Sequence, residues 1–280
     1  MKLVSFRHGD ASSFGIAVDD GVVDLHKRYP TIPDLRTLIA EIPTGQLSRF
    51  VGETADHDFA EIELKPPIPN PDKIICIGVN YHAHLAEIGM AKPDYPMIFL
   101  RLANTQVGHG RPLVRPRESE QFDYEGELAV IIGSRARRIP ESQALDVVAG
   151  YSCYNEGTIR DWQSHTRQVS PGKNFPATAG FGPWLVTKDD VPDLRSLTLS
   201  TRINGQQVQR AELSDMIFSV PELIAYCSRF TELVPGDIIS TGTTGGVGAY
   251  RKPPLWMKPG DTAEIEISHI GTLSNPVIAE

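Results

Sequence analysis

The sequence predicts a mixed, strand-rich α+β fold with a small N-terminal unit. The chain has 24 glycines and 22 prolines among 280 residues, which favours many turns and a β-heavy fold over a helix bundle. Segments of strand type outnumber the helix candidates, and this argues against a regular alternation of strands and helices. A hydrophobic fraction of 40% is enough to bury a large core in a chain of this length.

Residues 1–65 are expected to form a small N-terminal α/β domain. An Asp-Asp-Gly run at 19–21 lies between two apolar segments and indicates a β-hairpin. Apolar residues recur at helical spacing over 33–42 and predict a helix there. Four prolines follow within 65–71, where they exclude a helix interior or a central strand. We interpret this stretch as the entry into a second, larger domain over 66–280.

The larger domain is expected to begin with a buried strand over 73–78. A short helix is predicted over 80–89, with Asn80 and Gly89 as its two caps. A second helix is predicted over 220–229. The remaining predictions are strands over 97–100, 126–132, 183–186, 197–203, 237–240 and 262–267, and a hairpin turn at 204–205.

Charge and cysteine content exclude several classes of function. The net charge is -8 and no long basic stripe is present, so a nucleic acid is not expected as a partner. The longest clean apolar run, 128–132, is far too short to span a bilayer, and residues 1–13 lack the apolar core of a secretory signal. The three cysteines are widely spaced and form no CxxC pair, so a zinc knuckle is not indicated. We expect a cytoplasmic protein with reduced thiols and no membrane association.

Three glutamates are candidate metal ligands. Glu125 and Glu127 are two residues apart at the start of a predicted strand, so their side chains would share one face, where their charges repel unless a cation lies between them. From this segment alone, a solvated strand edge is an equally good interpretation. Glu156 follows an apolar, aromatic stretch and offers a third carboxylate, although single acids at turns are usually solvated. Carboxylates without thiolates suit Mg²⁺, Mn²⁺ or Ca²⁺.

Three polar residues downstream are candidates for substrate contact or catalysis. Arg160 and Gln163 are three residues apart, so on a helical turn they share a face that could hold a carboxylate or a diketo oxygen. Lys173 lies in a Gly/Pro-rich segment among uncharged neighbours, where it could be desolvated and reactive. The alternative for Lys173 is an ordinary surface lysine.

Two further features complete the set of candidates. His84 and Glu87 are also three residues apart on the predicted short helix, and a carboxylate that orients an imidazole creates a base able to activate water. An exposed ion pair is the alternative. Thr243 lies in a Gly-rich loop whose backbone NH groups and hydroxyls could bind a carboxylate or a phosphate. That loop lacks the Gly-Lys-Ser/Thr ending of a P-loop, so nucleotide binding is not indicated.

In their order along the chain, these segments resemble the fumarylacetoacetate hydrolase family, in its acylpyruvate hydrolase and 2-hydroxyhepta-2,4-diene-1,7-dioate isomerase-like branch. The resemblance covers roughly residues 70–280, whereas the first 65 residues match poorly. No single motif is decisive, but the ordered set is specific. It comprises Gly78-Val79-Asn80-Tyr81, His84 with Glu87, and the segments 123–128, 160–163, 172–173, 180–187, 233–243 and 258–261.

The resemblance implies a β-roll fold, a homodimer and a bound Mg²⁺ or Mn²⁺, with Ca²⁺ as a substitute in crystals. Glu125 and Glu127 fall on the metal ligands of the family. The third ligand of the family is usually aspartate, whereas this chain has Glu156, one methylene longer. Should Glu156 not serve, Asp161 is the nearest acidic substitute.

The resemblance also implies roles for the remaining candidates. Arg160, Gln163 and Thr243 would bind substrate, and Lys173 together with the His84–Glu87 pair would be catalytic, the pair being carried on a lid.

The implied activity is that of a divalent-metal-dependent hydrolase, which cleaves a C–C bond of an acylpyruvate or a related 2,4-diketo acid through an enolate. The same site could serve an isomerase, decarboxylase or hydratase that acts on a 2-keto or 2-hydroxy-dienoate or on oxaloacetate in aromatic or sugar-acid catabolism. A non-enzymatic module stabilised by an ion is the other class, but a structural ion requires no neighbouring Arg160, Gln163 and Lys173. For the loop 249–257, two interpretations stand: a surface loop, or a pocket wall from which Arg251 or Lys252 reaches an acidic substrate.

Overall fold

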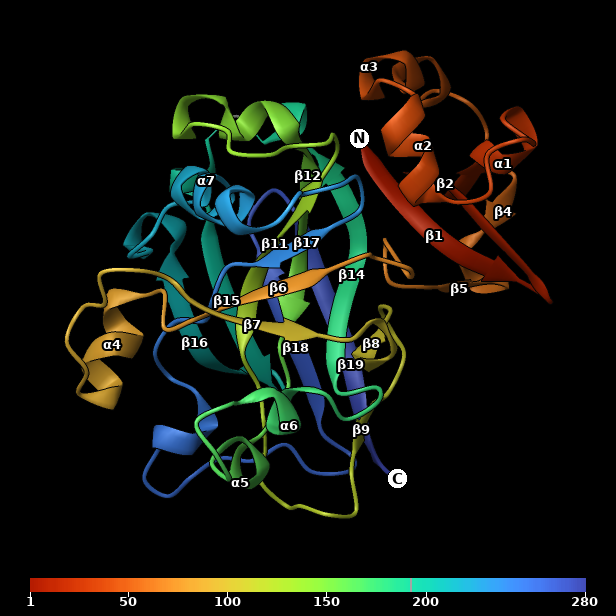
Figure 1. Ribbon diagram of the computed structural model, residues 1–280. Helices are drawn as coiled ribbons and strands as arrows, with labels where there is room; N and C mark the ends of the chain where they lie inside the picture. Colours follow the sequence, from red (N-terminus) through yellow and green to blue (C-terminus); the bar gives the residue numbers. More distant parts are fainter. Residues whose placement is uncertain (192) are drawn as a thin grey trace.

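The computed structural model of the protein describes residues 1–191 and 193–280. Within these residues, a 12-stranded mixed sheet packs against a five-stranded antiparallel and parallel sheet, and short helices surround them (Figure 1). The predicted strand-rich α+β architecture is confirmed. No helix within the described residues is both long and apolar enough to cross a membrane.

The large sheet runs in the order β4-β3-β2-β1-β14-β12-β11-β17-β6-β7, with β5 added to β1 and β8 added to β14. Its strands are β1 (Lys2–His8), β2 (Ala11–Val18), β3 (Gly21–Asp24), β4 (His57–Asp58), β5 (Ile62–Leu64), β6 (Ile74–Gly78), β7 (Met97–Arg101), β8 (Gln106–Val107), β11 (Gly126–Ile132), β12 (Val148–Asn155), β14 (Ala179–Thr187) and β17 (Ile238–Ser240). The outermost strand at one end is therefore β7, which carries two residues of the site described below.

The second sheet has the order β16-β15-β18-β19-β9, and a two-stranded ribbon joins β10 to β13. Their bounds are β9 (Leu113–Arg115), β10 (Phe122–Asp123), β13 (Thr158–Ile159), β15 (Thr198–Ile203), β16 (Gln206–Glu212), β18 (Thr262–Ile267) and β19 (Gly271–Ala279). Leu128 of β11 and Cys153 of β12 pack with Leu199 of β15 and Ile265 of β18 in one apolar cluster. The two sheets thus share a core.

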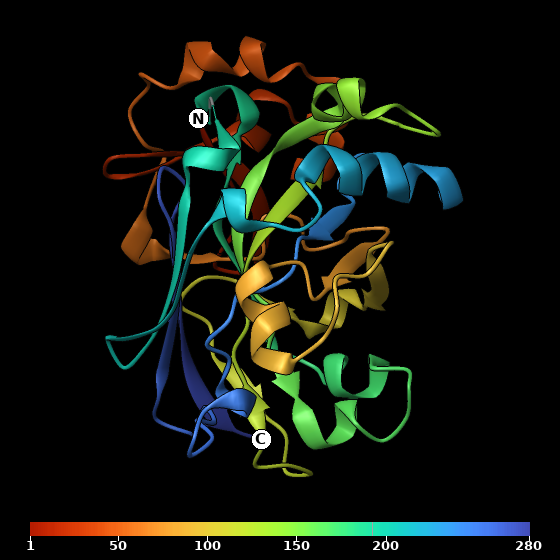
Figure 2. The same ribbon diagram turned by 90° about the vertical axis from the view of Figure 1, so that its left-hand side faces the viewer.

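The helices are short apart from α7, which has 11 residues. They are α1 (Leu25–Arg28), α2 (Leu35–Glu41), α3 (Thr44–Leu47), α4 (His82–Ile88), α5 (Arg160–Gln163), α6 (Ser170–Lys173) and α7 (Val220–Phe230). The 3-10 turns are Ser48–Phe50, Phe59–Glu61, Ala103–Thr105, Glu141–Val147, Lys188–Asp190, Leu194–Ser196, Leu213–Asp215 and Gly248–Tyr250. In Figure 2 the N-terminal helices lie at the top of the molecule and the α5–α6 pair lies in its lower half.

The N-terminal strands continue the large sheet. The Asp-Asp-Gly hairpin is confirmed, because Val18 of β2 pairs with Gly21 of β3 around it. Strand β1 also pairs with β14, with Leu3 opposite Leu185, and both residues belong to an apolar cluster that includes Ala129 of β11. The domain boundary at residue 65 remains a prediction, since the sheet and the core run across it.

The predicted helix over 80–89 is present as α4, but one of its caps is wrong. Gly89 ends the helix in the left-handed conformation (φ 69°), as predicted. Tyr81 rather than Asn80 occupies the N-cap, without a side-chain hydrogen bond. The Asn80 side chain instead donates to the carbonyls of Phe218 and Thr241, and so ties the segment before α4 to two distant loops.

The prediction of strands was incomplete. It placed one strand over 183–186, whereas β14 covers nine residues from Ala179, and it missed β12, β16 and β19. Strand β12 is buried along its whole length, so its sequence shows none of the alternation that marks a half-exposed strand. The three cysteines are free and buried.

Candidate active site

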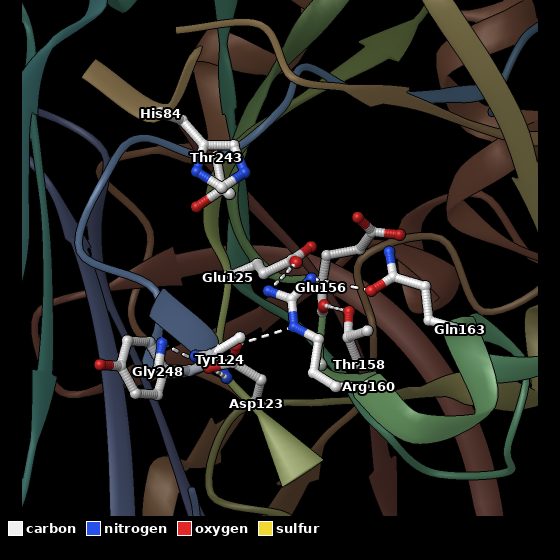
Figure 3. Close-up of polar contacts among 12 residues, drawn as sticks. His84, Asp123, Tyr124, Glu125, Glu156, Thr158, Arg160, Gln163, Thr243 and Gly248 are labelled. Atoms are coloured by element: carbon white, nitrogen blue, oxygen red, sulfur yellow. Dashed lines mark hydrogen bonds and ion pairs between the residues drawn. The ribbon is translucent and has the colours of Figure 1, made fainter. Parts of the chain in front are cut away.

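Two neighbouring strands bring the three predicted glutamates together. Antiparallel pairing of β11 with β12 places Gly126 opposite Asn155, so Glu125 and Glu127 flank the point where Glu156 leaves β12. One carboxylate oxygen from each of the three glutamates lies within 4.8 Å of the others, and all three side chains are buried (Figure 3 shows Glu125 and Glu156). Gly126 between them has to be small, because a side chain there would collide with Thr201 of the facing sheet. The solvated strand edge is therefore excluded.

The electrostatics of this cluster suit a divalent cation. Burial, and then the charges of Glu156 and Glu125, raise the pKa of Glu127 well above its ordinary value. The hydroxyl of Ser240 (2.6 Å) and the backbone NH of Gly242 (2.9 Å) donate to one oxygen of Glu127. Among the described residues, Oε1 of Glu156 has no hydrogen-bond partner. Three clustered carboxylates, one of which has an oxygen that accepts no hydrogen bond, fit an ion such as Mg²⁺ or Mn²⁺.

Lys173 is buried within the acid cluster rather than exposed on the surface. Its ammonium donates to Oε2 of Glu125 (2.6 Å) and Oε2 of Glu156 (2.9 Å), and lies 4.9 Å from the centre of the Phe99 ring. Burial acts to lower the pKa of Lys173, but the two carboxylates outweigh it and raise the pKa. The predicted desolvation is present, and the amine is nevertheless held as a cation.

Arg160 occupies the other side of Glu125. As predicted, it shares a helical face with Gln163, and its Nη1 donates to Oε1 of Gln163 (3.0 Å). It also donates from Nε to Asp123 (2.8 Å) and forms an ion pair with Glu125 (Figure 3). Burial acts to raise the pKa of Glu125, but Arg160 and Lys173 outweigh it and hold the pKa at about 2. Glu125 is therefore ionised at any working pH.

Two charged residues of the site were missed by the sequence analysis. Asp123 is buried and accepts hydrogen bonds from the backbone NH groups of Gly248 (2.7 Å) and Ala249 (2.9 Å) as well as from Arg160. Its place in the acidic run 123–127 could have revealed it. Arg101 ends β7 with its Nη1 3.5 Å from Oε1 of Glu156, and no local pattern marks a partner 55 positions away.

The predicted His84–Glu87 pair is present and largely buried. Nδ1 of His84 and Oε2 of Glu87 are 2.9 Å apart, and His84 is only 6% exposed, so the exposed ion pair is excluded. The other carboxylate oxygen of Glu87 accepts a hydrogen bond from the NH of Gly246 (3.0 Å). His84 lies near enough to Glu125 to contribute, after burial, Arg160 and Lys173, to the pKa of that carboxyl. The pair and the acid cluster thus belong to one site.

Thr243 is bound to the backbone of the residue between Glu125 and Glu127. Its hydroxyl donates to the carbonyl of Gly126 (3.0 Å) and accepts from Gln209 (2.8 Å), so it supports the start of β11. A role of Thr243 in binding substrate stays a prediction. Asp161, the alternative acid, accepts instead from the hydroxyl of Ser119 (2.7 Å) and is not among the clustered glutamates.

The loop after residue 248 does not offer Arg251 to the acid cluster. The guanidinium of Arg251 donates to the Tyr124 hydroxyl (2.9 Å), to the Gly246 carbonyl (3.0 Å) and to the Val208 carbonyl. These bonds fasten the loop to the body of the protein. A contact of Arg251 with an acidic substrate stays a prediction, although its Nε and Nη2 are used within the chain.

Residues 73–278 match the sequence model of a known family, described as fumarylacetoacetate (FAA) hydrolase C-terminal. The protein named oxaloacetate tautomerase fahd2, mitochondrial, of Xenopus laevis is 38% identical over 288 residues, which cover 99% of this chain and 90% of that protein. Oxaloacetate tautomerase YisK of Bacillus subtilis (strain 168) is 42% identical over 287 residues, covering 94% of this chain and 95% of that protein. The similarity therefore includes the N-terminal segment as well as the larger domain.

A similar solved structure extends the comparison to a different reaction. The maleylpyruvate hydrolase from Sphingobium sp. SYK-6, in complex with manganese(II) ion and pyruvate, has a TM-score of 0.83 and 29% identity, and the match covers 100% of this chain and 99% of that chain. Relatives of this chain thus include both tautomerases and a hydrolase on one fold.

Proposed function

Because the chain belongs to the fumarylacetoacetate hydrolase family, we propose that it is a divalent-metal enzyme that interconverts the enol and keto forms of a small 2-keto dicarboxylic acid, with oxaloacetate as the leading substrate. The observation that carries this proposal is the buried cluster of Glu125, Glu127 and Glu156 around Lys173, with the His84–Glu87 pair nearby. The names of the two tautomerase relatives support the choice of oxaloacetate.

The charge balance of the site supports a metal followed by an anion. Four buried carboxylates, those of the three glutamates and Asp123, outnumber the three cations Arg101, Arg160 and Lys173 by one charge. A divalent ion would reverse this excess to one positive charge. A keto-acid carboxylate would then meet a site of opposite charge, which favours its capture.

The residues of the chain divide the work of tautomerisation. When bound by the three glutamates, a divalent ion would polarise the keto oxygen and stabilise the negative charge that develops there. The Lys173 ammonium and the Arg160 guanidinium lie where they would orient the substrate carboxylate next to the keto group. Glu87 bonds Nδ1 of His84, which leaves Nε2 to remove a proton from carbon or oxygen and return it at the other position.

Hydrolysis of the C–C bond of an acylpyruvate is the second candidate. The observation that favours it is the same oriented imidazole, since a base near an electrophilic carbonyl can take a proton from water as well as from carbon. The manganese-containing maleylpyruvate hydrolase supports this alternative. Both reactions develop charge on the same oxygen, so the site alone favours neither.

A substrate panel separates the two candidates. Purified protein is treated with EDTA, reloaded with Mg²⁺ or Mn²⁺, and offered enol oxaloacetate and 2,4-diketo acids while enol absorbance is followed. A tautomerase accelerates enol loss from oxaloacetate without C–C cleavage, whereas a hydrolase releases pyruvate from the diketo acids. Chelation that lowers the melting temperature but leaves turnover intact would refute the metal enzyme and leave a structural ion.

We also propose that the protein acts as a homodimer. Supporting this, Met97 and Leu100 of β7, together with Tyr95 before the strand and Leu102 after it, expose large apolar side chains. Strand β7 is the outermost strand of the large sheet. An exposed apolar edge strand is a surface that proteins usually cover. Because β7 also carries Phe99 and Arg101 into the site, a partner on this edge would lie close to the catalytic residues. Sedimentation at micromolar concentration tests the oligomeric state.

A further inference from the structure

The short turn Gly248–Tyr250 is fixed on both sides of one exposed aromatic ring. Before the ring, the backbone NH groups of Gly248 and Ala249 donate to Asp123, which is buried at the centre of the site. After it, the guanidinium of Arg251 is bonded to Tyr124 and to backbone carbonyls. The backbone of Tyr250 is therefore held in place although its side chain is half exposed.

The ring of Tyr250 lies near both His84 and Arg160. Its centre is 6.1 Å from the centre of the His84 imidazole, in an edge-on arrangement at 74°. On the other side it is close enough to Arg160 to contribute to the raised pKa of that guanidinium, after burial, which acts to lower the pKa, and after the larger effects of Glu125 and Asp123. The phenol hydroxyl has no hydrogen-bond partner among the described residues.

We propose that Tyr250 determines substrate specificity by donating its phenol hydroxyl to the distal carboxylate of a 2-keto dicarboxylic acid. This inference rests on the proposed function. The metal-binding glutamates and Lys173 would hold the 2-keto acid end, so the far end of a four-carbon substrate extends toward His84 and the ring beside it. The hydroxyl is a free donor at that place.

The nearby cations are already engaged, which leaves the phenol as the available group. Arg160 is bonded to Asp123, Glu125 and Gln163 and is assigned to the carboxylate at the 2-keto end. Arg251 is bonded through Nε and Nη2 to Tyr124, Gly246 and Val208. A tyrosine on a fixed turn presents its hydroxyl with little loss of conformational freedom, since only two side-chain torsions have to be ordered. A hydrogen bond to a charged carboxylate then contributes roughly 10- to 100-fold to kcat/KM.

A different role is open to the same ring, and it makes a different prediction. If Tyr250 only shields the imidazole of His84, then the aromatic face matters and the hydroxyl does not. In that case a Tyr250→Phe variant behaves as the unchanged protein, and only Tyr250→Ala loses activity, on every substrate alike.

The test compares two substrates and two inhibitors on metal-loaded protein. Tyr250→Phe is expected to lose about 10- to 100-fold in kcat/KM for enol oxaloacetate and to keep its rate with enol phenylpyruvate, which has no distal carboxylate. In binding titrations it should bind malate more weakly and oxalate, which lacks a distal arm, as before. Tyr29→Phe, which loses only a surface hydrogen bond from Arg49 in the N-terminal segment, is the matched control.

Equal losses on both substrates, or no loss on oxaloacetate and malate, overturn the role of the hydroxyl. If unchanged protein turns over neither enol, the proposed tautomerase activity fails. The malate and oxalate titrations then still test the contact of Tyr250, so the two failures can be told apart.

Discussion

The acid cluster and the proton-transfer pair are built in different ways. Glu125, Glu127 and Glu156 stand at the ends of two central strands that are buried along their whole length. His84 and Glu87 lie on α4, which has seven residues. The Glu87 carboxylate accepts one backbone hydrogen bond, from Gly246. One half of the site is part of the core, and the other is attached to the core by few bonds.

This division allows the site to combine a rigid metal-binding part with access for the substrate. Carboxylates that hold an ion require fixed geometry, and strands inside a sheet supply it. A base that meets the reacting carbon has to admit substrate first, and a short helix between segments with exposed residues can move at little cost. We therefore expect substitutions in the acid cluster to act on metal binding and those around α4 to act on turnover.

The largest expected effect follows from Glu127→Gln. Glutamine keeps the oxygen that accepts from Ser240 and Gly242 but loses the charge that faces Glu156. Metal affinity should fall on the order of 10³-fold, the scale for removing one member of a buried charged set, and turnover should fall with it. Titration calorimetry with Mn²⁺ measures the loss.

The same variant has an opposite effect on the metal-free protein. Because burial and neighbouring acids disfavour the charge of Glu127, its removal should leave the melting temperature in EDTA unchanged or higher. As a control, Arg202→Gln breaks an ion pair with Glu266 on the second sheet and should change neither quantity. A lower melting temperature for metal-free Glu127→Gln would mean that the cluster is stable without an ion.

The next effect concerns the other half of the site. His84→Ala should lower kcat on the order of 10²-fold while the Mn²⁺ affinity stays within about twofold, because the imidazole transfers a proton and binds no ion. Glu87→Gln, which keeps the shape of the pair but weakens the orientation of the ring, should lose less. A His84→Ala variant with full activity on its substrate would remove the imidazole from the mechanism.

A smaller effect follows from acid. The pKa of Glu127 and of Glu156 is raised by burial, so protons compete with metal as the pH falls from neutral, and affinity should drop about tenfold per unit for each competing proton. Since the folded state binds these protons more tightly, metal-free stability should rise in the same window, down to the ordinary glutamate range. Glu125 acts in reverse: the stability it contributes is lost progressively as the pH falls from the ordinary glutamate range through its pKa of about 2. Melting curves without Mn²⁺ between pH 8 and 5 check the expected rise in metal-free stability. The same curves with Mn²⁺ check the expected loss of metal binding.

In both halves of the site, local relations were predictable from the sequence and long-range contacts were not. Two-residue spacing placed Glu125 and Glu127 together, and three-residue spacing paired His84 with Glu87, because both relations are local. Arg101 was missed, since its contact with Glu156 depends on how β7 and β12 are placed in the sheet. The uncharged neighbours of Lys173 indicated its desolvation, but its contacts with Glu125 and Glu156 depend on the packing of α6 against β7, which no pattern within α6 reveals.

The smallest effect comes from the bond that joins α6 to the edge strand. The side chain of Asn174, directly after Lys173, donates to the carbonyls of Leu100 (3.1 Å) and Ser170 (3.0 Å) and accepts from the NH of Leu102 (2.8 Å). It therefore fixes the lysine against β7 without touching the carboxylates.

Asn174→Ala should lower kcat about three- to tenfold, since each such hydrogen bond contributes roughly 1 kcal/mol, and metal affinity should hardly change. Asn174→Asp keeps the acceptor oxygen but loses both donated hydrogen bonds, so its kcat should lie between those of the unchanged protein and Asn174→Ala. Ser214→Ala, which removes a surface bond to Glu212, is the control. The contrary result is that Asn174→Ala weakens Mn²⁺ binding as strongly as Glu127→Gln does. That result would show that the position of Lys173 against β7 is part of the metal site, and it would contradict the division between the acid cluster and the proton-transfer pair.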